Sequence, residues 1–235
     1  MQAGDGVVDP IEAVAARMEA VAAPLSAEDG VRRFNELYLA VTLEVARVEA
    51  EGAAFEDAAF VSRLDVVFAD LYFQAVDDDD DGARRSVSRA WKPLFEKRAE
   101  RGIAPLQFAI AGMNAHINHD LALALVATTK EFGIGLQRDT PQHRDYVLVD
   151  GILERVQEEI KDRFTTGVIR DIDRAGGRVD DMVASWSVSR ARDNAWTQAQ
   201  TLDALGGSSF LRKQFLDALG RNVGFAGRAL LTLTG

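Results

Sequence analysis

A nearly uncharged stretch in the middle of the chain most constrains the fold. Between Ile103 and Thr129 the only formally charged residue is Asp120, and alanines recur throughout the stretch. A helix without a charged face is one that packs on all sides, and alanines allow close approach of neighbouring helices. The stretch is also long enough to span a bilayer, but the polar groups near its midpoint would be costly in hydrocarbon. The sequence therefore predicts a buried central helix and no membrane span.

The remainder of the chain also has helical periodicity. Apolar residues recur every three or four positions, and no segment alternates convincingly with a period of two. We therefore expect an all-α fold: one domain, residues 1–235, in which about seven or eight helices surround the central one. The expected helices cover 10–23, a segment opened by Ser26 and Asp29, 55–76, 84–101 with a break at Pro93, 103–129, a segment opened by Thr140 and Pro141, 179–205 and 209–231. The acidic run 77–81 with Gly82 is expected to end the helix that precedes it.

Composition excludes several classes of function. The net charge of -10 repels polyanions and anionic membranes, so neither nucleic acid nor a membrane is an expected partner. The absence of cysteine excludes disulfides and thiolate metal ligands. Residues 1–10 lack the basic and apolar regions of a signal peptide, so we expect a cytoplasmic protein. The expected partner is a small-molecule substrate or ligand. The oligomeric state is not predicted.

Five polar side chains interrupt the central helix. At about 100° per residue, His116, His119 and Asp120 fall within an arc of roughly 100°, whereas Asn114 and Asn118 point to the opposite side. Buried polar groups are costly unless each has a partner. The sequence therefore predicts a polar centre inside the bundle.

One interpretation of this centre is a metal site. Imidazole nitrogens and a carboxylate at positions i, i+3 and i+4 can supply up to three ligands to zinc, iron or manganese. Asp65 is on the core-facing stripe of its expected helix and could complete the ligand set. Glu44 and Asp145 are placed in the same way, and either could act as the general base.

Two other interpretations remain open. The centre could be a polar pocket for an organic ligand, in which Asn114, Asn118 and Trp186 orient the molecule and Arg190 receives an anionic group. It could also be a structural hydrogen-bond network, in which Asp120 orients a histidine and Arg190 or Arg192 neutralises the carboxylate.

The segment 111–125, with the sequence AGMNAHINHDLALAL, resembles the hallmark of a bacterial family known only as a domain of unknown function. A weaker similarity is to helical zinc-dependent phospholipases C and nucleases, whose metal helix carries His-x-x-x-Asp followed by an apolar residue. Here His116, Asp120 and Leu121 match that pattern, but Val126 stands where that family has another histidine. The resemblance implies hydrolysis by a metal-bound water.

We therefore state two hypotheses. The first is a metal-dependent hydrolase with its divalent metal on His116, His119, Asp120 and Asp65. The second is a metal-free protein that binds a small molecule in an enclosed apolar pocket, or an enzyme of specialised metabolism that needs no cofactor.

Overall fold

The computed structural model describes residues 9–51, 55–80, 82, 86–154 and 187–232. Its helices are α1 (Pro10–Ala22), α2 (Gly30–Ala50), α3 (Ala58–Asp80), α4 (Lys92–Lys97), α5 (Pro105–Ala115), η1 (His116–Asp120), α6 (Leu121–Glu131), a helix over residues 141–154, α9 (Val188–Ala204) and α10 (Ser209–Leu230). The described residues form no strand, and the predicted all-α bundle is confirmed.

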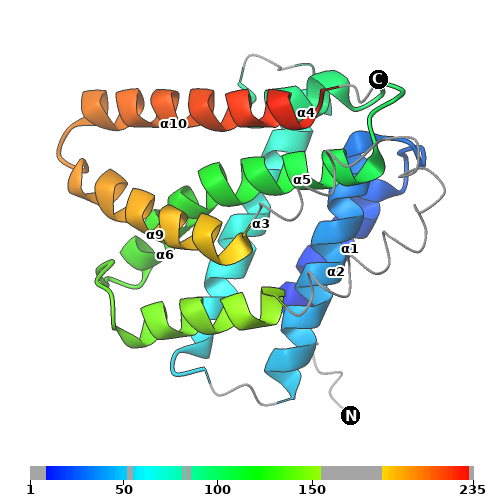
Figure 1. The fold of residues 1–235 in the computed structure, drawn as a ribbon. Coiled ribbons are helices and arrows are strands. Elements are labelled where there is room, and N and C mark those ends of the chain that lie inside the picture. The colour runs from blue at the N-terminus through cyan, green and yellow to red at the C-terminus, as the bar shows by residue number, and fades with distance from the viewer. Residues whose placement is uncertain (1–8, 52–54, 81, 83–85, 155–186, 233–235) are drawn as a thin grey trace, which may run out of the picture.

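The predicted central helix lies in the middle of the bundle as α5, η1 and α6 (Figure 1). Helices α2 and α10 pack against α5, while α3 and α9 pack against α6. Ala109, Ala115, Ala122 and Ala124 are fully buried, which is what allows several helices to approach this one closely. The small side chains that predicted a buried helix are thus the surfaces on which its neighbours pack.

The central helix is not a uniform α-helix. Residues His116–Asp120 form one turn of π-helix, which the periodicity of the sequence did not predict. A π-turn places one extra residue in the helical turn and often occurs at functional sites. Here the turn contains both histidines and Asp120, so it sets the relative direction of the three predicted site residues.

The boundaries of α3 differ from the prediction. The acidic run does not end the helix: α3 continues to Asp80, and a left-handed residue, Gly82 with φ 69°, follows. Arg98 compensates part of this charge, because its guanidinium lies 3.3 Å from Asp79 and also pairs with Asp29 at 2.9 Å. Ion pairs supplied by a distant segment thus overcome the repulsion between neighbouring carboxylates.

Local capping explains several helix starts. The carboxylate of Asp29 accepts a hydrogen bond from the Val31 amide at 2.8 Å, so Asp29 rather than Ser26 caps α2. Thr140 accepts from the His143 amide at 3.2 Å, which confirms the predicted start of the 141–154 helix. Pro93 stands in the first turn of α4, where proline is tolerated, and so begins a helix instead of breaking one.

Two glycines allow close contacts around the central helix. A Cβ at Gly112 would lie 2.3 Å from the Phe34 ring, so only glycine lets Phe34 pack on α5 there. A Cβ at Gly224 would lie 2.2 Å from the carbonyl oxygen of Arg89, so α10 approaches this backbone directly.

Among the helices described, none is long and apolar enough to cross a membrane.

Candidate ligand cavity at His116

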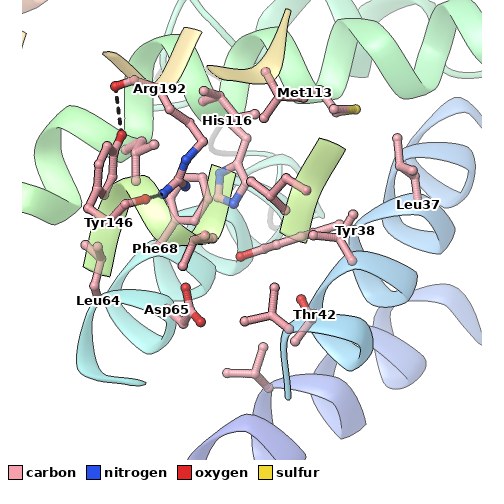
Figure 2. A pocket seen from close by; sticks show the side chains of 18 of the residues that line it. Leu37, Tyr38, Thr42, Leu64, Asp65, Phe68, Met113, His116, Tyr146 and Arg192 are labelled. Carbon is pink, nitrogen blue, oxygen red and sulfur yellow. Dashed lines mark hydrogen bonds between the residues drawn. The ribbon is translucent and has the colours of Figure 1, made fainter. Parts of the chain in front are cut away.

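An apolar cavity of about 130 Å³ lies beside the π-turn. Helices α2, α3, α5 and the 141–154 helix supply most of its wall, which is largely aliphatic and aromatic. The exceptions are six side chains with a polar group, which are Tyr38, Thr42, Asp65, His116, Tyr146 and Arg192 (Figure 2). A pocket of this kind, mostly apolar with a few converging polar groups, is typical of a small-molecule site.

The imidazole of His116 is held in one orientation. The residue is 2% exposed, and its ring stacks on Phe68 with a centroid distance of 3.5 Å and an interplanar angle of 4°. The ring of Tyr38 meets it at a centroid distance of 4.7 Å and an angle of 67°. Because α2 and α3 provide these two rings, the orientation of His116 depends on three helices packing together.

Asp120 accepts hydrogen bonds from three side chains. His116 Nδ1 lies 3.1 Å from Asp120 Oδ2, and His119 Nδ1 lies 2.7 Å from Oδ1. Trp91 donates its indole N–H to Oδ2 at 2.8 Å. Burial by itself would raise the pKa of Asp120, but the hydrogen bonds from the two histidines outweigh it and hold the pKa below its usual value. Asp120 is therefore an ionised, fully buried acceptor.

This arrangement fixes the tautomer of His116. Its Nδ1 donates to a carboxylate, so Nε2 of the neutral ring carries a lone pair and needs a donor. Burial lowers the pKa of His116 and outweighs the effect of Asp120, which keeps the ring neutral. Nε2 is shielded from water and has no hydrogen-bond partner among the described residues. A buried polar atom in this condition costs about 1–3 kcal/mol.

The hydroxyl of Tyr38 lies on the same side of the cavity. In Figure 2 the hydroxyl of Tyr38 and the imidazole of His116 point into one space, with Asp65 beyond them. Burial, followed by the charges of Asp65 and Asp120, raises the pKa of Tyr38 well above its ordinary value, so the hydroxyl remains a donor. The structure shows no hydrogen bond from this hydroxyl to a described residue.

Arg192 forms another part of the wall. Its Nε donates to Asp150, its Nη2 donates to the Tyr146 carbonyl at 2.8 Å, and the guanidinium lies 4.0 Å from the Tyr146 ring centroid. The Tyr146 hydroxyl in turn donates to the Arg192 carbonyl at 2.8 Å (Figure 2). The expectation that Arg192 neutralises Asp120 is therefore wrong, because the guanidinium of Arg192 pairs with Asp150. Three N–H donors at Asp120 make an arginine there unnecessary.

His116 and His119 both contact Asp120, but the four predicted metal ligands do not line one cavity. His116 and Asp65 line the cavity, whereas His119 does not, and its Nε2 atom lies beside Gly220 of α10. Asp120 lies behind His116 and is occupied by its three donors. Within the described ranges, no group of three or more His, Asp or Glu side chains is arranged to hold a metal ion.

The two predicted general bases lie outside the cavity wall. Asp145 is 2% exposed, and its carboxylate accepts the backbone amides of Glu56 at 2.9 Å and Asp57 at 2.7 Å, next to the start of α3. Glu44 binds Arg47, one turn further along α2, at 2.6 Å. Neither carboxylate lines the cavity. The contacts of Asp145 indicate that it stabilises the entry into α3.

Three of the four predicted ligand-orienting residues do not line the cavity. Asn114 donates to the Val223 carbonyl of α10 at 3.0 Å, and Asn118 donates to Asn114 at 3.2 Å. Arg190 is exposed and does not line the cavity. Trp186 lies outside the described residues. Asn114 thus joins the central helix to α10, and Asn118 supports Asn114.

The predicted site residues did not include the aromatic side chains that surround His116 and Asp120. Tyr38 and Phe68 belong to the apolar stripes of α2 and α3, where an aromatic residue has the same pattern in a packed core as in a binding pocket. Trp91 lies 29 positions from Asp120. The one available signal was that a buried tyrosine hydroxyl needs a polar partner and that the central helix holds a polar cluster.

Fold and site together define a class of protein: a helical bundle with a small apolar cavity, at whose wall a carboxylate holds a neutral histidine. The chain belongs to a family described as a family of unknown function (DUF5995), whose model matches residues 11–233. This confirms the expected resemblance to a family without a known activity. No curated protein and no solved structure matches the chain.

Proposed function

We propose that the protein binds a small apolar molecule of about the size of one aromatic ring, with a hydroxyl group at His116. The observation that carries this proposal is that His116 lines an apolar cavity and that its buried Nε2 atom has no partner among the described residues. A ligand that donates a hydrogen bond to this atom removes its desolvation penalty.

The size and lining of the cavity support the proposed ligand. A cavity of about 150 Å³ lined by apolar side chains can hold benzene, and the cavity here is about 130 Å³. Each Å² of apolar ligand surface removed from water contributes roughly 25 cal/mol, so an aromatic ring supplies most of the binding energy.

A hydroxyl group matches both polar side chains near the cavity centre. It can donate to Nε2 of His116 and at the same time accept from the hydroxyl of Tyr38. A carboxylate would be less suitable, since its ionised form offers no proton to Nε2. The geometry therefore favours a neutral alcohol or phenol over an anion.

Phenol and toluene test this proposal, because they have similar shapes and differ in the hydroxyl group. Binding of each is measured by calorimetry or ligand-observed NMR to the wild type and to the His116→Phe variant. We expect wild type to bind both, and the ratio of phenol to toluene affinity to fall about tenfold in the variant, which corresponds to one hydrogen bond of about 1.4 kcal/mol.

A second pair of variants tests where the molecules bind. Val41 lines the cavity, whereas Leu43 lies on the same helix, is 51% exposed and does not line it. Val41→Phe is expected to abolish binding of both molecules, and Leu43→Phe to leave it unchanged. If wild type binds neither molecule, or if Val41→Phe binds both normally, the proposal is wrong.

A further inference from the structure

We propose that His116 and Tyr38 form an acid–base pair that moves a proton on the bound molecule, so that the cavity enolises a small apolar ketone. This inference rests on the proposed function, because it uses the same cavity and the same two polar side chains. In it, His116 Nε2 removes a proton from the carbon next to the carbonyl group, and the Tyr38 hydroxyl donates to the carbonyl oxygen.

His116 has the features of a general base. Its Nε2 atom carries the lone pair, and Asp120 at 3.1 Å from Nδ1 stabilises the imidazolium that forms when Nε2 takes a proton. Phe68 prevents the ring from tilting, and the donors Trp91 and His119 keep the Asp120 carboxylate in place. A base held in this way needs no reorganisation when the proton is transferred.

Tyr38 supplies the second half of the reaction. When the carbon loses its proton, negative charge develops on the carbonyl oxygen, and a donor aimed at this oxygen stabilises it. The cavity lining is mostly apolar, so such a hydrogen bond is stronger there than in water. The hydroxyl remains protonated because burial and two nearby carboxylates oppose its ionisation.

The atoms and electrons balance without a further reactant. The C–H bond breaks, its electron pair forms a carbon–carbon double bond, and the carbonyl π electrons move to the oxygen. The proton resides on Nε2 of His116 and returns to the same carbon, or to another carbon of the conjugated system. Solvent hydrogen enters the molecule when the proton on Nε2 exchanges with water before one returns to the same carbon, and return to another carbon isomerises the molecule.

The proposed hydroxyl ligand and this reaction are chemically related. A phenol carries its hydroxyl on an sp² carbon, as the enol of a ketone does. A site in which Tyr38 donates to such an oxygen is complementary to the enol. Phenol and the ketone therefore compete for the same cavity and for the same donor.

The test measures exchange of the methyl hydrogens of acetophenone in D₂O by proton NMR, with wild-type protein at neutral pD. We expect protein-dependent exchange that phenol inhibits. Tyr38→Phe should slow the protein-dependent rate about 100-fold, as loss of a donor to an oxyanion does. His116→Gln should slow it by a similar or larger factor.

Tyr72→Phe is the matched control. It also removes a buried tyrosine hydroxyl, but this one donates to Asn35 at 3.1 Å and does not line the cavity. The control should exchange acetophenone at the wild-type rate. Folding of each variant is checked by thermal denaturation, and the phenol affinity of Tyr38→Phe is measured to separate binding from proton transfer.

The two proposals fail in different ways. If phenol binds in the cavity but acetophenone exchanges no faster than in buffer, the acid–base pair is refuted and the binding function stands. The acid–base pair is also refuted if acetophenone exchanges but Tyr38→Phe and His116→Gln leave the exchange rate unchanged. If phenol does not bind at all, both proposals are wrong.

Discussion

The imidazole of His116 lies flat on the phenyl ring of Phe68, with the two centroids 3.5 Å apart. This contact joins the central helix to α3 and sets the direction of Nε2. We expect Phe68→Leu to lower the ratio of phenol to toluene affinity at least threefold, because a ring free to tilt holds its hydrogen bond less well. Phe132→Leu is the control. The ring centroids of Phe132 and Phe60 lie 5.8 Å apart, and Phe132 does not line the cavity. Equal ratios in the two variants would show that the stacking does not orient His116.

The indole of Trp91 is expected to stabilise the fold through the charge on Asp120. Trp91→Phe removes a hydrogen bond to a carboxylate, worth about 1.5–3 kcal/mol, whereas Trp196→Phe removes one to the Leu136 carbonyl, worth about 0.5–1.5 kcal/mol. Both tryptophans are buried, so the loss of volume is the same. Denaturant unfolding should show Trp91→Phe to be the less stable variant by about 1 kcal/mol; the opposite order would mean that Asp120 does not depend on this donor.

Asp145 is expected to affect stability and not ligand binding. In Asp145→Asn one of the two amides that the carboxylate accepts, those of Glu56 and Asp57, loses its partner. The free energy of unfolding should fall by about 2 kcal/mol, because a hydrogen bond to a charged carboxylate is lost. Acetophenone exchange by the folded variant should equal that of wild type. A loss of exchange with unchanged stability would restore the catalytic role that the sequence suggested.

Gly224 and Gly151 should respond to alanine in opposite ways. Gly224→Ala places a methyl group 2.2 Å from the Arg89 carbonyl oxygen and should lower the free energy of unfolding by about 3 kcal/mol, because backbone has to move. Gly151 is exposed within the 141–154 helix, with nothing within 4 Å of its Cβ position. There alanine should raise the free energy of unfolding by about 0.5–1 kcal/mol. Thermal or urea unfolding measures both changes.

Stability should fall as the pH falls below about 6.5. Burial lowers the pKa of both His116 and His143 from 6.5, so below this pH the unfolded chain binds protons that the folded protein does not. Each histidine contributes a slope of up to about 1.4 kcal/mol per pH unit. His143 also accepts the Asp139 amide at 3.4 Å through Nδ1, which requires an unprotonated nitrogen.

Urea unfolding between pH 5.5 and 7.5 measures this slope. His143→Gln should show a smaller decrease on acidification than wild type, because one of the two histidines is gone and the other titratable groups are the same. An identical slope in the two proteins would show that His143 is not responsible.

Much of the helical structure followed from local chemistry. Pro10 after Asp9, Thr140 before the 141–154 helix and Ser208 before α10 stand at helix starts in the structure, because a cap and the first turn depend on neighbouring residues. The end of α3 was predicted too early, since Arg98, which pairs with Asp79, comes from a distant segment.

The chain sequence by itself determined that most of residues 103–129 are buried, because a helix with one charged residue and many alanines has no face suited to water. It also determined that His116 and Asp120 share a side of that helix, since they are four positions apart. The tertiary structure decided everything that depends on partners from other helices. It placed Trp91 and not an arginine on Asp120, Phe68 and Tyr38 around His116, and Asp145 against the backbone before α3. A periodic pattern shows which face of a helix is buried, whereas the identity of the groups that meet there depends on how the helices pack.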